Sequence, residues 1–280
     1  MKIVRKPEWL QKKSNQGDQA EMRRLLGELR LNTVCQQALC PNISECFSCG
    51  QATFLILGTN CTRTCSFCNV EKTFPLPVDT DEPGRVAEAI VRLKLTHVVI
   101  TSPTRDDLPD GGADIYAATV AAIRYSSSET KVELLIPDFK GELASLVVVT
   151  SSKPYIIGHN VETVPRLYHI RSGSDYHRSL DVLRKCGELA PDIRTKSGIM
   201  LGMGEKREEV LQLFADLRTV RCNYLSIGQY LAPSRVHYPV QEYIQPERFN
   251  EFREAALKLG FDHVESGPYV RSSYHAGQYA

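Results

Sequence analysis

From Ala52 onward, this chain of 280 residues alternates short apolar runs with amphipathic stretches, and this alternation most constrains its fold. The apolar runs predict strands at Ala52–Leu57, His97–Thr101, Val132–Ile136, Tyr155–Asn160, Lys196–Leu201, Asn223–Leu231 and Asp262–Ser266. Between them, apolar residues recur with helical spacing, as in Val210, Leu213, Phe214 and Leu217. Strand–helix alternation of this kind indicates a parallel sheet with crossover helices.

The repeats leave two architectures open, a full or partial β/α barrel and a doubly wound sheet. One segment, Ser145–Thr150, has the composition of a strand but lies where the alternation requires a helix. Before Ala52 the sequence is polar, and it contains one predicted helix near Glu21–Leu31. In a barrel the functional site lies at the carboxyl ends of the strands, so we expect function in the loops that follow them.

Six of the nine cysteines crowd into one short stretch, in two sets of three. The sets are Cys35, Cys40 and Cys46, followed by Cys61, Cys65 and Cys68. Three thiolates hold three irons of a [4Fe–4S] cluster and leave the fourth iron open to a small molecule. The alternative is a zinc knuckle or accidental clustering, although zinc sites usually pair CxxC units in a closed four-ligand shell. The pattern therefore favours catalytic iron–sulfur chemistry.

Composition argues against several other classes of function. Hydrophobic residues make up 42% of the chain, and a net charge of +1 favours neither nucleic acid nor an anionic membrane as partner. No apolar run approaches the roughly 20 residues of a membrane-spanning helix, and the basic N-terminus lacks the apolar segment of a signal peptide. We therefore expect a cytoplasmic protein, in which grouped cysteines indicate metal binding or catalysis rather than disulfides.

The second cysteine set reads CTRTCSFC, and its spacing, with Phe67 just before the last cysteine, resembles the radical S-adenosylmethionine (SAM) superfamily. The resemblance implies that Cys61, Cys65 and Cys68 hold a [4Fe–4S] cluster whose open iron binds SAM. One electron then cleaves SAM and leaves a 5′-deoxyadenosyl radical, which takes hydrogen from an unactivated carbon. Cofactor and cluster carry this chemistry, while the protein positions and shields them.

The first set, C-x4-C-x5-C directly before the second, resembles the lipoyl synthase family. The resemblance continues through Pro7–Leu10, Arg105–Ala113, Leu135–Gly141, His159–Tyr168, Thr195–Glu205, Ile227–Val240 and Gly267–Ala276, nearly the whole chain in order. It implies that Cys35, Cys40 and Cys46 hold an auxiliary [4Fe–4S] cluster, with Ser273 of the sequence RSSY as its fourth ligand. A serine alkoxide is harder than the thiolates that such iron prefers, which suits a cluster dismantled for its sulfur.

The same resemblance implies the reaction and its partners. The substrate is an octanoyl chain linked to a lysine of a lipoyl-carrier protein domain, and sulfur from the auxiliary cluster enters at C6 and C8. A low-potential electron donor and an iron–sulfur cluster carrier for rebuilding complete the expected partners. Two rivals remain: another radical SAM sulfur inserter, such as a biotin synthase or methylthiotransferase, and a non-catalytic iron–sulfur or zinc scaffold. The former lack the first cysteine set and RSSY.

Several residues are predicted to contact SAM or substrate. Asn160 and Glu162 follow a predicted strand and are candidates for the SAM ribose or amino group, with a turn or helix cap as the alternative. Arg105, also at a strand end, is a candidate for a carboxylate of SAM or substrate, or else a solvated charge. Phe67 joins these cofactor-binding candidates. Cys49, three residues after Cys46, forms a CxxC to which we assign no role.

Together these features predict an α/β fold, a partial (β/α)6 barrel similar to a TIM barrel. The predicted N-terminal extension, residues 1–50, carries the auxiliary-cluster cysteines. The predicted barrel domain spans residues 51–262, and a C-terminal segment, residues 263–280, brings RSSY back to close the auxiliary cluster.

Overall fold

The computed structural model describes residues 6–11, 19–274 and 276–278, and its strands form one eight-stranded sheet. The strands are β1 (Asn32–Thr33), β2 (Thr53–Leu55), β3 (His97–Thr101), β4 (Lys131–Leu135), β5 (Ile156–Gly158), β6 (Arg194–Leu201), β7 (Tyr224–Gln229) and β8 (His263–Gly267). They lie in sequence order, with β1 antiparallel to β2 and every later neighbouring pair parallel. This arrangement confirms the predicted α/β class.

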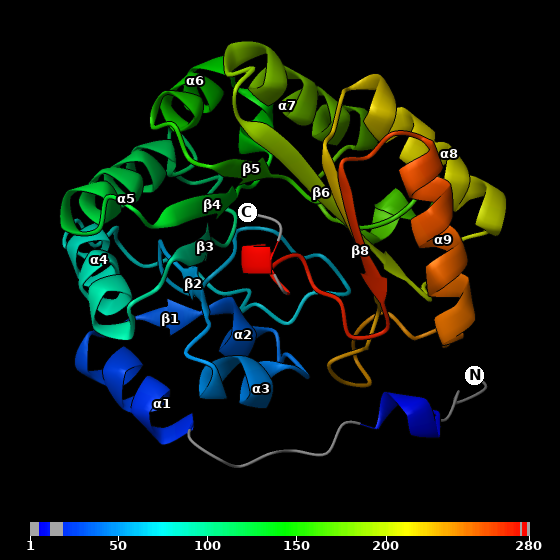
Figure 1. The fold of residues 1–280 in the computed structure, drawn as a ribbon, viewed down its shortest axis with the longest axis horizontal. Helices are drawn as coiled ribbons and strands as arrows, with labels where there is room; N and C mark the ends of the chain where they lie inside the picture. Colours follow the sequence, from blue (N-terminus) through cyan, green and yellow to red (C-terminus); the bar gives the residue numbers. More distant parts are fainter. Residues whose placement is uncertain (1–5, 12–18, 275, 279–280) are drawn as a thin grey trace.

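Six helices lie outside the curved sheet, each following one strand from β2 to β7 (Figure 1). They are α4 (Glu82–Leu93), α5 (Ala113–Ser126), α6 (Leu143–Ser151), α7 (Tyr176–Leu189), α8 (Arg207–Thr219) and α9 (Pro246–Lys258). Within the described ranges no ladder joins β8 back to β1. The barrel is therefore partial, built from six β/α units plus β8 as a seventh parallel strand.

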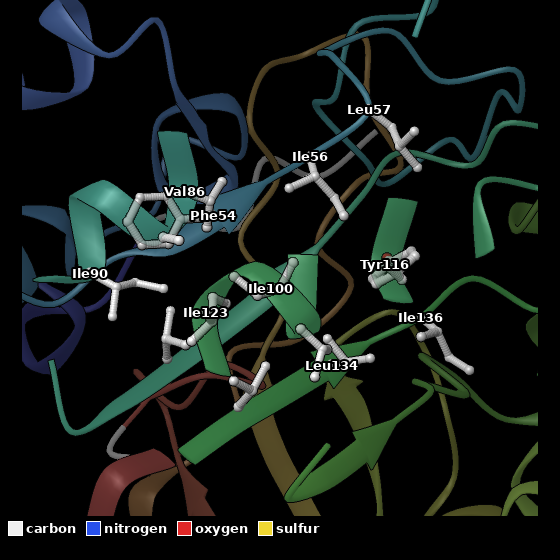
Figure 2. Packing of buried hydrophobic residues seen from close by; sticks show 14 of the residues in the cluster. Phe54, Ile56, Leu57, Val86, Ile90, Ile100, Tyr116, Ile123, Leu134 and Ile136 are labelled. Carbon is white, nitrogen blue, oxygen red and sulfur yellow. The ribbon is translucent and has the colours of Figure 1, made fainter. Parts of the chain in front are cut away.

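Apolar packing between the helices and the sheet holds this barrel together. Ile100 and Leu134, on β3 and β4, meet Ile90 and Ile123 from α4 and α5 in one buried cluster (Figure 2). Each of these side chains is essentially inaccessible to solvent, and burying one contributes about 1.5–3 kcal/mol. Helices cover the outer face of the sheet, which leaves its inner face free to line a site.

The segment with an ambiguous pattern, Ser145–Thr150, is helical and belongs to α6. Leu146 and Val149 are buried three residues apart, whereas Val147 faces outward with 41% of its surface exposed. The Thr150 hydroxyl donates to the carbonyl of Leu146, so this buried hydroxyl finds its hydrogen-bond partner within the helix. Tertiary packing between α5 and α7 overrides the β propensity of the valine run.

The N-terminal extension contains more structure than the single helix predicted from sequence. That helix is α1 (Gln19–Glu28), and two short helices follow it, α2 (Val34–Gln37) and α3 (Ile43–Ser48). The Thr33 side chain caps α2 by accepting a hydrogen bond from the backbone N–H of Gln36. Helices of four and six residues are too short to show a periodic pattern in the sequence. Such short helices are stabilised by tertiary contacts rather than by their own residues.

The sheet crosses both predicted boundaries, because β1 precedes residue 50 and β8 follows residue 262. After β8 the chain turns inward, and a short 3-10 helix, η4 (Ala276–Gln278), lies near the centre of the ring of strands (Figure 1). Ala276 is buried, and Gly277 lies beside His97 at the start of β3. No helix in the described part of the chain is long and apolar enough to cross a membrane.

Candidate active site

A cavity of about 540 Å³ opens where the barrel strands end, and both cysteine sets contribute to its lining. Its walls come from the extension, the loop after β2, the ends of β3 to β7 and the segment after β8. The cysteines that line it are Cys35, Cys40, Cys61, Cys65 and Cys68, and Ser273 lines it too. The site therefore lies at the carboxyl ends of the strands, where barrel chemistry is expected.

The second cysteine set lies on the loop between β2 and α4, and short contacts fix this loop against the barrel. The Thr62 hydroxyl donates to the carbonyl of Thr104, and it accepts a hydrogen bond from the backbone N–H of Asp106. The backbone N–H of Cys61 donates to the carbonyl of Glu71, and that of Arg63 donates to the sulfur of Cys61 at 3.4 Å. These contacts present three thiols from one turn of chain toward the cavity.

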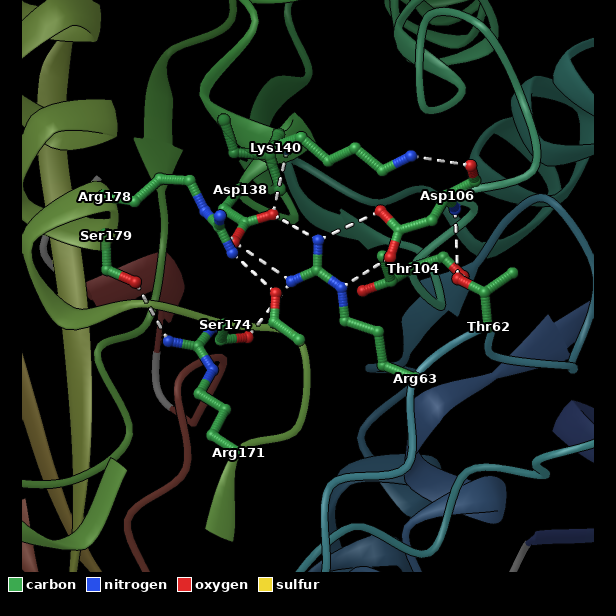
Figure 3. A network of polar contacts seen from close by, with 12 residues as sticks. Thr62, Arg63, Thr104, Asp106, Asp138, Lys140, Arg171, Ser174, Arg178 and Ser179 are labelled. Atoms are coloured by element: carbon green, nitrogen blue, oxygen red, sulfur yellow. Dashed lines mark hydrogen bonds and ion pairs between the residues drawn. The ribbon is translucent and has the colours of Figure 1, made fainter. Parts of the chain in front are cut away.

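Arg63, in the middle of the cysteine motif, anchors the loop through a buried charge network (Figure 3). Its guanidinium forms two hydrogen bonds with each of two carboxylates, Asp106 after β3 and Asp138 after β4. Arg178 pairs with Asp138 from α7 at 2.8 Å. Burial alone would raise the pKa of Asp138, but its bonds to Arg63 hold that pKa well below the usual range. Sequence reasoning missed this network, since its members are distant in the chain.

The thiols of the second set are partly withdrawn from water. Burial raises the pKa of Cys65, and it raises the pKa of Cys68 to about 12. A bare thiolate is disfavoured in such a place, and a bound metal cluster is what would stabilise it there. All six of the grouped cysteines, and Cys49 with them, are free thiols in the structure. Phe67 lines the same cavity, and its contact with the cofactor stays a prediction.

The first cysteine set lies across the cavity, on the two short helices of the extension. Cys35 is on α2 and is buried, Cys40 follows that helix, and Cys46 is on α3. Cys46 is partly exposed and lies outside the cavity lining, and Cys49 ends α3 with its side chain exposed. The extension thus places two predicted ligands at the cavity and a third just behind them.

The C-terminal segment with RSSY is tied to the extension by two side-chain contacts and to β2 by a third. The buried Asn42 amide donates to the carbonyl of Tyr269 at 2.7 Å. The Tyr274 hydroxyl donates to the Glu45 carboxylate on α3 at 3.2 Å. The Thr53 hydroxyl donates to the Ser273 oxygen at 2.7 Å. The predicted fourth ligand therefore reaches the neighbourhood of the first cysteine set, although 220 residues separate Thr53 from Ser273.

Asn160 and Glu162 line the cavity after β5, and their contact with SAM stays a prediction. The Asn160 amide nitrogen donates to Glu162 at 3.1 Å and to the Ser272 hydroxyl at 2.6 Å. Burial raises the pKa of the Glu162 carboxyl, which Arg171 partly offsets. Gly198 admits this group, because a Cβ there would lie 2.7 Å from the Asn160 oxygen. That oxygen is buried without a hydrogen-bond partner among the described residues.

Arg105 lies elsewhere than predicted. It is 2% exposed and outside the cavity lining, and its guanidinium donates to the carbonyls of Leu57 and Leu76 and to the Asp107 carboxylate. These bonds occupy the guanidinium and fasten the chain on both sides of the cysteine loop. Arg105 is buried beneath the cysteine loop and does not face the cavity. In this position it does not make the predicted contact with a carboxylate of SAM or substrate.

The donor set fits an iron–sulfur cluster. Three free thiols from one loop face a shared cavity, and a [4Fe–4S] cluster binds each thiolate to a different iron. In residues 6–11, 19–274 and 276–278, no three His, Cys, Asp or Glu side chains gather as ligands of a single metal ion. The unpartnered Asn160 oxygen nearby is a polar group suited to a bound ligand.

Comparisons with known proteins agree with this geometry. The family model of the radical SAM superfamily matches residues 55–217, which include the second cysteine set and β3 to β6. A solved structure of methylornithine synthase has a similar fold, with a TM-score of 0.57 and 13% identity, covering 90% of this chain and 82% of that one. The chain belongs to the radical SAM superfamily, whose members use a [4Fe–4S] cluster and SAM.

The closely similar relatives define the family within that superfamily. A lipoyl synthase of Geobacter metallireducens is 69% identical, covering 100% of this chain and 99% of the relative. A lipoyl synthase of Trichlorobacter lovleyi is 66% identical, with 100% of both chains covered. At this identity over the full length, the chain is a member of the lipoyl synthase family, and it is a radical SAM enzyme.

Proposed function

We propose that the protein inserts two sulfur atoms, at C6 and C8, into an octanoyl chain carried on a lysine of a lipoyl-carrier domain. The observation that carries the proposal is that both cysteine sets meet at one cavity, with Ser273 on the side of the first set. A radical SAM centre alone needs one such set. A second set, with a serine beside it, supports a second [4Fe–4S] cluster that serves as the sulfur source.

The division of roles follows the lining of the cavity. Cys61, Cys65 and Cys68 hold the radical SAM cluster, and Cys35, Cys40, Cys46 and Ser273 hold the auxiliary cluster. When bound, SAM and its cluster supply a 5′-deoxyadenosyl radical, and the auxiliary cluster supplies sulfur. The protein contributes a shielded space of about 540 Å³ between the two sites, within the range of small-molecule pockets.

Residues of the barrel orient the bound molecules. Asn160 and Glu162 are proposed to bind the polar groups of SAM, since both face the cavity and Asn160 has spare hydrogen-bonding capacity. Phe67 packs beside the second cysteine set and helps to exclude water. Apolar side chains at the ends of β4 and β6, Leu135 and Ile199 among them, offer a surface for an alkyl chain. Arg105 holds the loop in place and leaves these contacts to others.

The proposed partners follow from the reaction. An octanoylated carrier domain brings its lysine arm to the mouth of the cavity. A low-potential electron donor must approach the second cysteine set, and an iron–sulfur cluster carrier rebuilds the auxiliary cluster. The described residues include no membrane-spanning helix and the net charge is +1, so none of these partners has to be a membrane or nucleic acid.

Anaerobic turnover of the iron- and sulfide-reconstituted protein tests the proposal. The protein is mixed with SAM, a strong reductant and an octanoyl-lysyl peptide, and the products are read by mass spectrometry. The proposal expects a dithiolane product with two 5′-deoxyadenosines for each peptide. Formation of 5′-deoxyadenosine without sulfur insertion would contradict the role of the auxiliary cluster. Formation of neither product, with both clusters intact, would favour a non-catalytic scaffold.

A further inference from the structure

Thr53 is the first residue of β2. It lies between the N-terminal extension, which carries the first cysteine set, and the C-terminal segment, which carries Ser273. It is 3% exposed and lines the cavity. Its backbone is fixed on the sheet, because Thr53 pairs with Val99 of β3 and the next residue pairs with Thr33 of β1. A side chain on such a strand has a defined direction, in contrast to one on a loop.

Thr53 contacts one of the four proposed ligands of the auxiliary cluster directly and lies near a second. Its hydroxyl donates to the Ser273 oxygen at 2.7 Å. Cys35 lies on α2, which packs against β2, and it lines the same cavity as Thr53. One residue of the barrel therefore holds a serine of the C-terminal segment beside a cysteine of the extension.

The neighbouring serine is held in a different way. Ser272 accepts a hydrogen bond from the Asn160 amide at 2.6 Å, on the side of the cavity where SAM is proposed to bind. The two adjacent serines of RSSY thus point to opposite walls. The contact with Thr53 distinguishes Ser273 from Ser272 and directs Ser273 toward Cys35.

The hydrogen bond from Thr53 to Ser273 matters because of the chemistry of a serine ligand. Ser273 must lose its proton, which leaves to water, before its oxygen binds iron as an alkoxide. A donor already directed at that oxygen stabilises the anion, because hydrogen bonds to charged groups are stronger than those between neutral groups.

We propose that Thr53 is a positioning residue that holds Ser273, beside Cys35, as a ligand of the auxiliary cluster. This inference rests on the proposed function, because it takes Ser273 as a ligand. It adds a residue outside the cysteine sets and RSSY, and it predicts that the lability of the cluster depends on a hydroxyl that never touches the iron.

The test compares Thr53→Val with Thr53→Ser in the reconstituted full-length protein. Thr53→Val keeps the shape of the side chain but removes the hydroxyl, and Thr53→Ser keeps the hydroxyl. The readout is the rate of iron release to a ferrous chelator, with the auxiliary cluster contributing about four of about eight irons. We expect that phase to be about tenfold faster in Thr53→Val and parent-like in Thr53→Ser.

A matched control is Thr119→Val, since Thr119 is a fully buried threonine on α5 whose hydroxyl bonds only the carbonyl of Ile115 among the contacts described. Parent-like iron release from Thr53→Val would overturn the inference, and so would a Thr119→Val effect of the same size. If Thr53→Val fails to fold, Thr53→Ala removes the same hydroxyl with less bulk and is read in the same way.

Ser273→Ala, measured in parallel, separates this inference from the proposed function. If Ser273→Ala releases iron quickly and Thr53→Val does not, Ser273 stands as a ligand and the role of Thr53 is refuted. If Ser273→Ala itself behaves like the parent, the assignment of Ser273 fails, and the role of Thr53 fails with it. Fast release from both, with Thr53→Ser restored, supports the two assignments together.

Discussion

The two cysteine sites of this protein face one cavity but are built in different ways. The second set lies within a single loop, and the ion pairs of the buried Arg63 with Asp106 and Asp138 lock that loop to the barrel. The proposed ligands of the first site come from the extension and the C-terminal segment, which are held in place by single hydrogen bonds such as Thr53 to Ser273. A site that must persist is thus held by charges, and a site proposed to be dismantled is held by weaker contacts.

The largest effect is expected when the second set loses a thiol. Cys61→Ala should lower 5′-deoxyadenosine formation by more than about a thousandfold, because the cluster that binds SAM is no longer held. Mass spectrometry of the anaerobic reaction measures this product, and iron analysis should still find the auxiliary cluster. Normal 5′-deoxyadenosine yield from this variant would show that the two sites are assigned wrongly.

Replacing Arg63, which anchors the cysteine loop, should lower the free energy of unfolding. Arg63→Met removes the partner that Asp106 and Asp138 share. Because Asp138 keeps its pair with Arg178 and Asp106 is 25% exposed, the loss should lie near the lower end of the about 3–5 kcal/mol that breaking a buried pair costs. Chemical denaturation measures the free energy of unfolding. The control is Arg166→Met, which breaks an exposed pair with Glu209 and should cost less than about 1 kcal/mol. Equal losses in both variants would contradict the role of the buried network.

Ser273→Ala tests the first site without touching the second. We expect SAM cleavage to continue while dithiolane formation falls by about a hundredfold, since hydrogen bonds and the ligand that assemble the auxiliary cluster are lost. Ser272→Ala is the adjacent comparison, because Ser272 bonds Asn160 on the opposite wall. Full dithiolane yield from Ser273→Ala would remove this serine from the ligand set.

The free energy of unfolding should also depend on pH through His159, which follows β5. His159 is fully buried, its Nδ1 lies 2.9 Å from the Ile136 carbonyl oxygen, and burial lowers its pKa to about 4. The folded protein keeps this histidine neutral, so its contribution is complete above pH 6.5 and is lost as pH falls toward 4. Between pH 7 and 5.5 the free energy of unfolding should fall by about 1.2 kcal/mol, a loss absent in His159→Gln. Identical pH dependence in both proteins would refute this.

The smallest effect is expected at the outer contact of the first site. Tyr274→Phe removes the hydrogen bond to Glu45 on α3 and should destabilise the docked C-terminal segment by about 1 kcal/mol. Iron release from the auxiliary cluster would then be a few-fold faster. If iron release were faster in Tyr274→Phe than in Thr53→Val, the main attachment of RSSY would be to α3 and not to β2.

Local patterns were sufficient to predict much of this protein. The alternation predicted the strands β2 to β8 and five of the six helices that follow β2 to β7, because period and length are properties of short segments. The sixth helix, α6, has the composition of a strand, so its sequence is ambiguous. The cysteine spacing located the second set on the loop after β2. Short helices such as α2 and α3 escaped prediction because two turns or fewer carry little periodic signal.

The sequence by itself determined which donors are present, how they are spaced and which fold carries them. Only the tertiary structure decided which of them meet: Ser273 with Thr53, Ser272 with Asn160, and Arg105 under the loop rather than in the cavity. These contacts join residues up to 220 positions apart, and their formation depends on how the whole domain folds. Spacing along the chain carries no information about such distances, because packing of the whole domain sets them.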